Sequence, residues 1–218
     1  MALDLGFNPE EVRTSIEAVK TSYEHLMQAI NKDVQNVFFQ QMSEMWACVQ
    51  AQEFFTALKE HMDNVINSSN STFESIVAAM NSAARAWAAK TKYPSYQDIP
   101  ITLDSSVLDA SVIHENINNI RGIDSQNATT TVETCMGAIT DGTESAVNEA
   151  KSAVETCGFL DYGNVQASEL SSSVTSIGQA IKEVMDQTSG DVAKAIRETL
   201  ESYGDTQGQI QQAFAGGK

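Results

Sequence analysis

Apolar residues recur at alternating spacings of four and three along most of this chain, and no other feature limits its fold so strongly. The first series is Val12, Ile16, Val19, Tyr23, Leu26 and Ile30. This spacing places all of them on one stripe of an α-helix, with polar and charged residues between. A stripe of this kind has to be buried against another helix, so the pattern predicts long, paired amphipathic helices.

Four such helices are expected from successive series and from the capping residues near them. Asn8 stands before Pro9 and two acidic residues, which is a helix-start signal. Gly137 and Gly142 lie inside the third series and leave its continuity open, and the Gly- and Gln-rich sequence from Gly204 predicts a mobile tail. The expected helices span 9–43, 48–91, 105–156 and 164–203.

Two interruptions divide the chain into helical hairpins. Pro94 and Pro100 end the second helix and begin an extended link, and the Gly-containing stretch 157–163 marks a second turn. The predicted fold class is all-α: two long antiparallel helical hairpins forming an elongated four-helix bundle. The predicted units are 1–97, a first hairpin, and 98–218, a second hairpin with a flexible C-terminal tail.

The two hairpins can be aligned as repeats. An offset of 116 residues sets Trp46 on Tyr162 and Trp87 on Tyr203. Any two amphipathic helices can be phased in this way, so periodicity alone predicts much of the match. Duplication and coincidence therefore both remain open at this point.

The composition excludes several classes of function. The chain of 218 residues carries 29 acidic and 13 basic side chains, a net charge of −16, and would repel nucleic acids. No run of 18 apolar residues predicts a membrane span, and the first residues lack the basic and apolar regions of a secretory signal. Three cysteines without close spacing indicate synthesis in a reducing cytoplasm.

No constellation of residues predicts catalysis. His25, His61 and His114 lack metal-ligand spacing, and phosphate-binding glycine loops and nucleophile elbows are absent from the sequence. We therefore expect no enzyme activity, cofactor, metal or small-molecule substrate.

If both hairpin tips lie at the same end, Cys48 and Cys157 approach each other and could pair after export, although two ordinary thiols are the simpler expectation.

The tip of the first hairpin carries the strongest hint of identity. Trp46-Ala47-Cys48 lies between two long amphipathic helices in an acidic chain. It resembles the Trp-x-Gly turn of the WXG family, the early secretory antigenic target group of type VII secretion substrates. Members of that family are helical hairpins that pair as antiparallel dimers into four-helix bundles. The resemblance covers most of residues 8–214, as two tandem units that imitate a dimer.

The resemblance assigns roles to particular residues. Trp46 and Cys48 form the first turn motif, and Tyr162 and Gly163 stand at the second turn, which has no tryptophan. The family export signal is a tyrosine followed four residues later by an acid; here Tyr203 is followed by Gln207. Cys48 stands where the family has glycine.

These residues lead to a prediction of function. We expect a non-enzymatic protein, secreted without a cleavable signal peptide by a bacterial type VII system, or acting in one as partner or chaperone. Its partners would be the secretion ATPase or a co-secreted helical protein, and it would be a monomer that mimics a dimer. The alternatives are an intracellular targeting partner of a larger helical toxin and, with less support, a pore-forming helical toxin.

Overall fold

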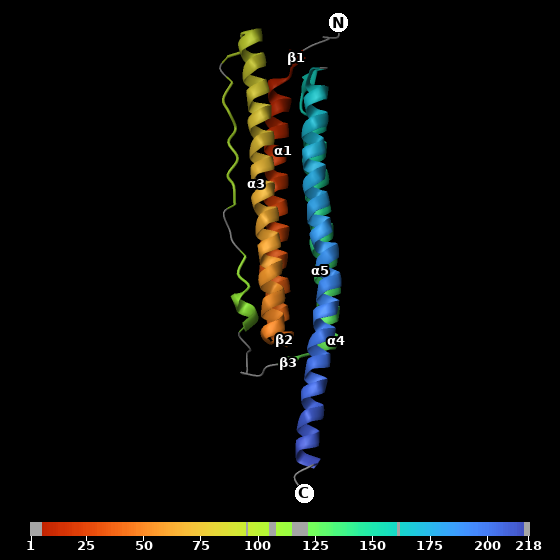
Figure 1. Cartoon of the computed structure of the whole chain (residues 1–218). Helices are drawn as coiled ribbons and strands as arrows, with labels where there is room; N and C mark the ends of the chain where they lie inside the picture. Colours follow the sequence, from red (N-terminus) through yellow and green to blue (C-terminus); the bar gives the residue numbers. More distant parts are fainter. Residues whose placement is uncertain (1–5, 95, 105–107, 115–121, 161, 216–218) are drawn as a thin grey trace.

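The protein is a long, bundle-like rod made almost entirely of helices (Figure 1). The computed structural model describes residues 6–94, 96–104, 108–114, 122–160 and 162–215. Its strands are two residues each, so the expected all-α class is confirmed.

The first helical segment is unbroken from Pro9 to Met45, close to the expected 9–43. The side chain of Asn8 caps it by accepting hydrogen bonds from the amides of Glu10 and Glu11. The segment consists of α1 (Pro9–Gln28), a π-helix η1 (Ala29–Phe39) and α2 (Gln40–Met45). A π turn closes bonds from i to i+5 and holds more residues than an α turn.

The second long helix, α3 (Val49–Thr91), agrees closely with the expected 48–91. It passes through the polar stretch 67–71 without a break, because its apolar stripe keeps its phase there and the buried face stays packed. Lys92 ends it in the left-handed conformation, with φ at 54°. Strand β2 (Trp46–Ala47) forms the turn between α2 and α3.

The third expected helix, 105–156, was wrong in its first part. Residues 108–110 form no helix, and residues Ser111–His114 form only a 3-10 turn, η2. Strand β3 (Gly122–Ile123) then precedes α4, which spans Ser125–Glu155. The other expected helical positions, 105–107 and 115–121, lie outside the described residues.

Helix α4 continues through both of its glycines. A Cβ atom at Gly142 would stand 3.1 Å from the Cβ of Ala29, at the start of η1. The glycine therefore permits a close approach between α4 and the first helical segment, and this packing offsets its low helix propensity.

The last helix, α5 (Tyr162–Ala215), is longer than the expected 164–203. The mobile tail expected from Gly204 is wrong for residues 204–215, which remain helical. Helix α5 projects past the start of α4 and past β2 (Figure 1). Strand β4 (Phe159–Leu160) lies in the turn between α4 and α5.

Two short antiparallel strand pairings join the first half of the chain, α1 to α3, to the second half, α4 and α5. β1 (Gly6–Phe7) pairs with β4, and β2 pairs with β3. An equivalent backbone hydrogen bond lies next to each strand pairing. The amide of Asn8 donates to the carbonyl of Gly158 at 2.8 Å, and the amide of Asp124 donates to the carbonyl of Met45 at 2.7 Å. Asp124 also caps α4 as Asn8 caps α1. The strand before each half's first helix therefore binds the turn of the other half.

This pairing excludes the arrangement with both turns at one end, under which Cys48 and Cys157 could have approached each other. The chain recrosses the length of the molecule between α3 and β3, so the β2 turn and the β4 turn lie at opposite ends (Figure 1). Cys48 and Cys157 are consequently far apart, and neither they nor Cys135 form a disulfide.

The repeat alignment is also revised. The capping strands correspond at an offset of 116 residues, as β1 and β3 do, but the turns correspond at 113. The structural counterpart of Trp46 is thus Phe159 and not Tyr162. The first half has three more residues between its cap and its turn than the second, and the wider turns of η1 take up such residues without lengthening the helix.

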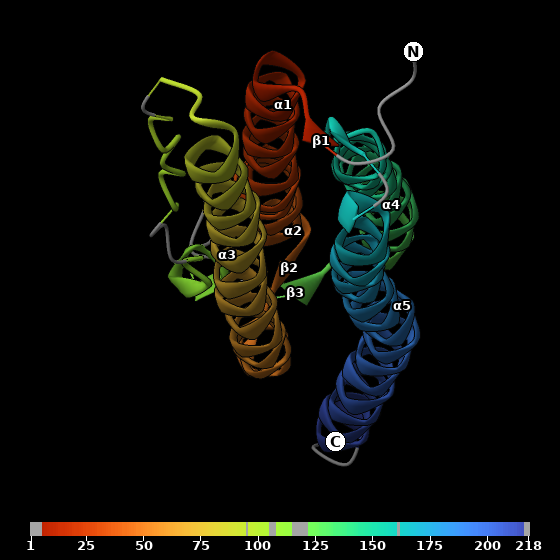
Figure 2. The same ribbon diagram turned by 90° about the horizontal axis from the view of Figure 1, so that it is seen from above.

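Each helix buries its apolar stripe against two neighbours. α1 packs on α3 and α4, and α5 packs on α3 and α4 (Figure 2). Buried polar side chains occur within this core, among them Ser69 and Thr143, whose hydroxyls have no hydrogen-bond partner within the described ranges.

Gly158 offers a test of the turn that holds the N-terminal strand. Its φ is +59°, and an added Cβ would stand 2.7 Å from the Cβ of Glu11. We expect Gly158→Ala to lower the free energy of unfolding by about 1–3 kcal/mol, measured by urea titration. Gly190→Ala is the matched control, because a Cβ there meets nothing within 4 Å; it should stabilise by about 0.5–1 kcal/mol. Equal effects of the two substitutions would contradict this role of the turn.

Candidate functional site

Trp46 lies in β2 at the tip of the first half and is fully buried. Its backbone is extended, and it pairs across the small sheet with Ile123. Its indole Nε1 has no hydrogen-bond partner in the described part of the chain. The ring is thus positioned by packing alone.

The packing comes from an aromatic cluster at the same tip. The Trp46 ring stacks on Phe54 at a centroid distance of 6.0 Å and meets Phe55 edge-on at 5.9 Å. Phe55 in turn lies 5.4 Å from both Phe38 and Phe39. Trp46 therefore closes the end of the core. These phenylalanines pack against one another and against Trp46 inside the first half.

Cys48 is the N-cap residue of α3, is half-buried, and makes no side-chain capping bond. Its φ is −159°, an extended conformation that any residue adopts. The backbone at this position therefore does not require glycine.

Tyr162 and Gly163 lie in the first turn of α5, at the opposite end of the molecule from Trp46 and Cys48. The two turn motifs proposed from the sequence therefore do not form one site. Each lies beside a capping strand from the other half instead.

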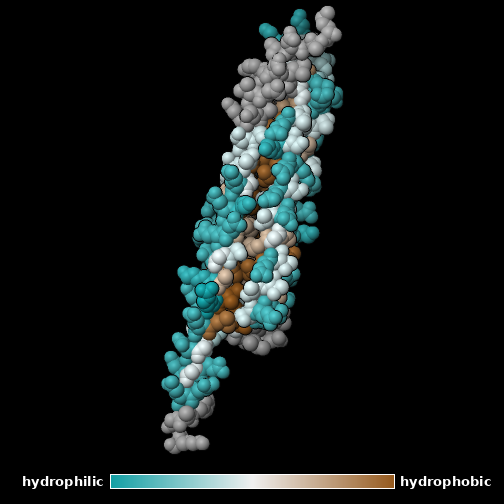
Figure 3. Space-filling model, turned by 90° about the vertical axis from the view of Figure 1, so that its right-hand side faces the viewer, coloured by the Kyte–Doolittle hydropathy of each residue, from teal (hydrophilic) through white to brown (hydrophobic). Residues whose placement is uncertain are grey.

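Tyr203 and Gln207 lie in the projecting end of α5. They are four residues apart on a helix, so they share one face, and both are exposed. Leu200 and Ile210 are exposed on the same projection, at 42% and 50%. Figure 3 shows apolar surface just above this end and mainly polar surface along it.

Sequence analysis missed a second candidate site, the segment that returns from α3 to β3. We call residues 96–104 and 108–113 the strap. It lies on the face of α1 and α3 that points away from α4 and α5 (Figures 1 and 2). Its apolar side chains pack onto the first half, and the buried ones are Ile99, Leu108, Ala110 and Ile113. The alternation of Ile99, Ile101 and Leu103 was the available signal, since a period of two indicates extended chain.

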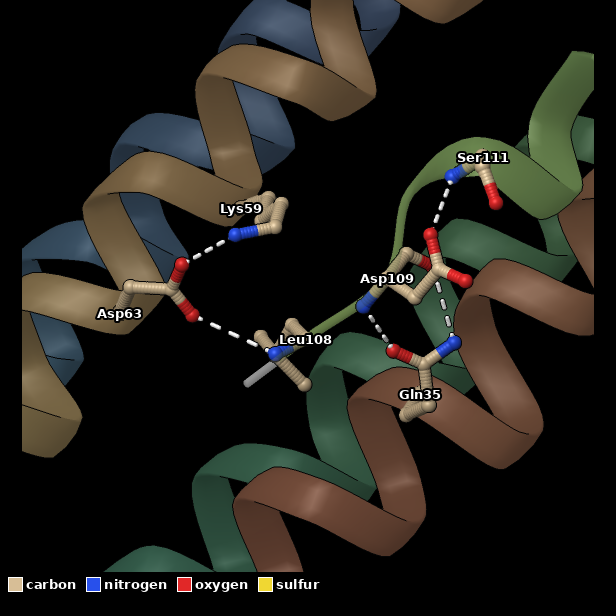
Figure 4. Close-up of polar contacts among 6 residues, drawn as sticks. All are labelled: Gln35, Lys59, Asp63, Leu108, Asp109 and Ser111. Atoms are coloured by element: carbon tan, nitrogen blue, oxygen red, sulfur yellow. Dashed lines mark hydrogen bonds and ion pairs between the residues drawn. The ribbon is translucent and has the colours of Figure 1, made fainter. Parts of the chain in front are cut away.

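Side chains on the helices hold the strap by its backbone. Asn81, which is buried, accepts from the amide of Ile99 at 3.0 Å and donates to its carbonyl at 2.8 Å. Gln35 does the same with the amide and carbonyl of Asp109 (Figure 4). The amide of Leu108 donates to Asp63, which is paired with Lys59 (Figure 4).

A polar cluster anchors the middle of the strap. The Tyr23 hydroxyl donates to Asn70 Oδ1 at 2.7 Å and accepts from the amide of Asp104 at 2.6 Å. Asn70 donates to the carbonyl of Asp104 at 2.9 Å, and Asn31 donates to its carboxylate at 2.7 Å. Burial raises the pKa of Tyr23, whose ionised form could not donate to Asn70.

The carboxylate of Asp109 caps the 3-10 turn η2, which begins at Ser111. It accepts a hydrogen bond from the amide of Ser111 at 2.8 Å (Figure 4). Hydrogen bonds from the side chain and backbone of Ser111 lower the pKa of Asp109, so this carboxylate is charged at neutral pH. Its side chain faces solvent.

Two grooves between the described helices are lined by few reactive side chains. One of 420 Å³ between α3 and α5 is lined mainly by serine and threonine, with no titratable side chain. Another between α1 and α4 includes Glu149, which pairs with His25 at 2.7 Å. Burial, reinforced by Asp33, raises the pKa of the Cys135 thiol, which makes it a poor nucleophile. Within the described ranges, no three His, Cys, Asp or Glu side chains gather as metal ligands.

Comparison with known proteins adds no relative. No family model, curated protein or solved structure matches this chain. Among the described residues, no helix combines the length and apolar character needed to cross a bilayer.

The strap should loosen at alkaline pH. Burial raises the pKa of both Tyr23 and Tyr96 above the ordinary 10.0. Above pH 10 the folded protein therefore keeps protons that the unfolded chain has lost. The contribution of these tyrosines to the free energy of unfolding is fully present below pH 10 and is lost as the pH rises through their folded-state pKa values. Unfolding free energies measured across this range should fall less steeply in Tyr23→Phe. Tyr93→Phe, at an exposed position, is the control; an unchanged slope in Tyr23→Phe would contradict the prediction.

Proposed function

We propose that this chain is a non-enzymatic helical interaction protein, exported by a bacterial type VII secretion system or acting within one as partner or chaperone. Its body is two long antiparallel helical hairpins, one built from α1 to α3 and the other from α4 and α5. Together they form an elongated four-helix bundle within one chain.

The reciprocal pairing of the two halves is the observation that carries this proposal. Each capping strand binds the other half's turn, β1 with β4 and β2 with β3, and the turns lie at opposite ends. In the WXG family, two separate hairpins pair antiparallel into such a bundle. The internal two-fold arrangement supports a tandem unit that imitates that dimer, with Trp46 closing one end of its core.

The projecting end of α5 supports a role for Tyr203 and Gln207 as the export signal. A secretion ATPase can reach only residues that stand clear of the bundle, and these two share an exposed helical face. Gln207 has the shape of glutamate without its charge, so the signal would be weakened rather than lost.

The body should be a monomer in solution. Both apolar faces are already buried against each other within one chain, so light scattering should give a mass near 23.6 kDa at all accessible concentrations. An obligate dimer would contradict the intramolecular bundle.

Export is the direct test of the function. The protein, tagged internally, should appear in culture supernatants of its native host and disappear from them when the type VII membrane ATPase is deleted. We expect Tyr203→Ala to reduce export several-fold and Gln207→Glu, which restores the acid of the family pattern, to increase it.

Gln209→Ala serves as the matched control, because Gln209 is exposed on another face of the same helix end. Retention of the protein in the cytoplasm of both strains would contradict export and favour the intracellular targeting partner of a larger helical toxin.

A further inference from the structure

The groove that holds the strap is formed by α1 and η1 on one side and α3 on the other. Three strap residues, Ile99, Asp104 and Asp109, each have both the backbone amide and the carbonyl bonded to helix side chains. The anchored residues recur at every fifth position. Contacts of this kind read an extended main chain and place few demands on its side chains, as in other peptide-recognition sites.

The groove also supplies apolar contacts and positive charge. Ile99 and Leu108 are buried in it, while Ile101 and Leu103 are half-buried. Arg85 pairs with strap residue Asp98.

Arg13 adds positive charge along the same groove, whereas the charge of Lys59 is balanced by Asp63. Lys59 is paired with Asp63 beneath the strap, and Arg13 lies close enough to Tyr96 to oppose the rise of its pKa. In a chain with a net charge of −16, a groove with the cations Arg13 and Arg85 favours an acidic extended segment over a basic one.

The strap can leave this groove without separating the halves of the bundle. β1–β4, β2–β3, α1–α4 and α3–α5 join the halves independently of it, and it lies on the opposite face (Figure 2). Its connection to α3 starts at Lys92, whose φ of 54° is strained for a residue with a side chain.

We propose that the groove between α1–η1 and α3 is a binding site for an extended, acidic, apolar peptide segment of a partner protein, and that the strap occupies it as an internal pseudo-ligand. The strap defines what fits: apolar side chains at alternate positions, aspartates at the edges, and a backbone free to bond at every fifth residue. This site is separate from the projecting end of α5, so purified protein tests it independently of export.

A labelled synthetic peptide with the sequence of residues 96–113 is the probe, titrated into the full chain by fluorescence anisotropy. The wild-type strap competes within the same molecule and keeps the apparent affinity low. The strap-weakened variant Ile99→Ala/Leu108→Ala/Ile113→Ala leaves the groove unchanged and raises the open fraction. We expect it to bind the peptide at least about tenfold more tightly than the wild type.

Two controls define the site. Adding Asn81→Ala and Gln35→Ala to the strap-weakened variant removes the paired backbone contacts and should abolish the gain. A peptide carrying asparagine in place of its aspartates should bind more weakly and with less dependence on salt. Peptide binding that survives the loss of Asn81 and Gln35, or no binding to a strap-weakened variant of normal helicity and mass, would overturn the proposal.

Hydrogen exchange in the wild-type chain tests the same point without a destabilising substitution. The amides of Ile99, Asp104 and Asp109 should exchange faster than those in the middle of α3, because the strap opens locally, and excess peptide should accelerate them further. If these amides exchange only at the rate of global unfolding, the strap does not open and the groove is not a separate binding site.

Discussion

Burial of one continuous apolar stripe per helix is the constraint on which the rest of this structure depends. Helices of 31 to 54 residues with many serines, threonines and glycines have modest intrinsic stability, and it is their packing that keeps them regular. The stripe carries α3 through the polar stretch 67–71 and α4 through Gly142, where the missing side chain brings α4 close to Ala29. At its C-terminal end, α5 extends beyond the helices that pack on it, and apolar side chains there face solvent.

Packing of stripes alone would let the helices slide along one another, and local polar contacts fix their positions. The backbone amides of the two N-cap residues, Asn8 and Asp124, each donate a hydrogen bond to the turn of the other half. These bonds set the ends of the rod and hold the β2 and β4 turns apart. The aromatic cluster around Trp46 then fills the space that the β2 turn encloses, and Gly158 supplies the left-handed backbone of the other turn.

The strap occupies the outer face of the first half, where we place the proposed peptide site. A connection of this length could have run free in solvent, yet five side chains from the helices bond its backbone, and Asn81 and Gln35 do so with both ends of their amides. Burying the strap satisfies those side chains and covers apolar surface on the first half. The proposed peptide site and the proposed export signal therefore lie on different parts of the molecule and involve different interactions, backbone pairing in one and an exposed helical face in the other.

The sequence by itself determined the fold class, the start of α1 at Pro9 and almost the full span of α3, because stripe, cap and proline signals are local. It misplaced the start of α4, because Leu108, Val112 and Ile113 fit a helical series as well as an extended strap, and only contacts with distant residues such as Gln35 and Asp63 separate the two. The tertiary structure alone decided that Trp46 and Tyr162 lie at opposite ends and that the counterpart of Trp46 is Phe159. The physical reason is that register and chain direction follow from bonds between residues far apart in the sequence, such as Asn8 with Gly158 and Met45 with Asp124, which no local pattern encodes.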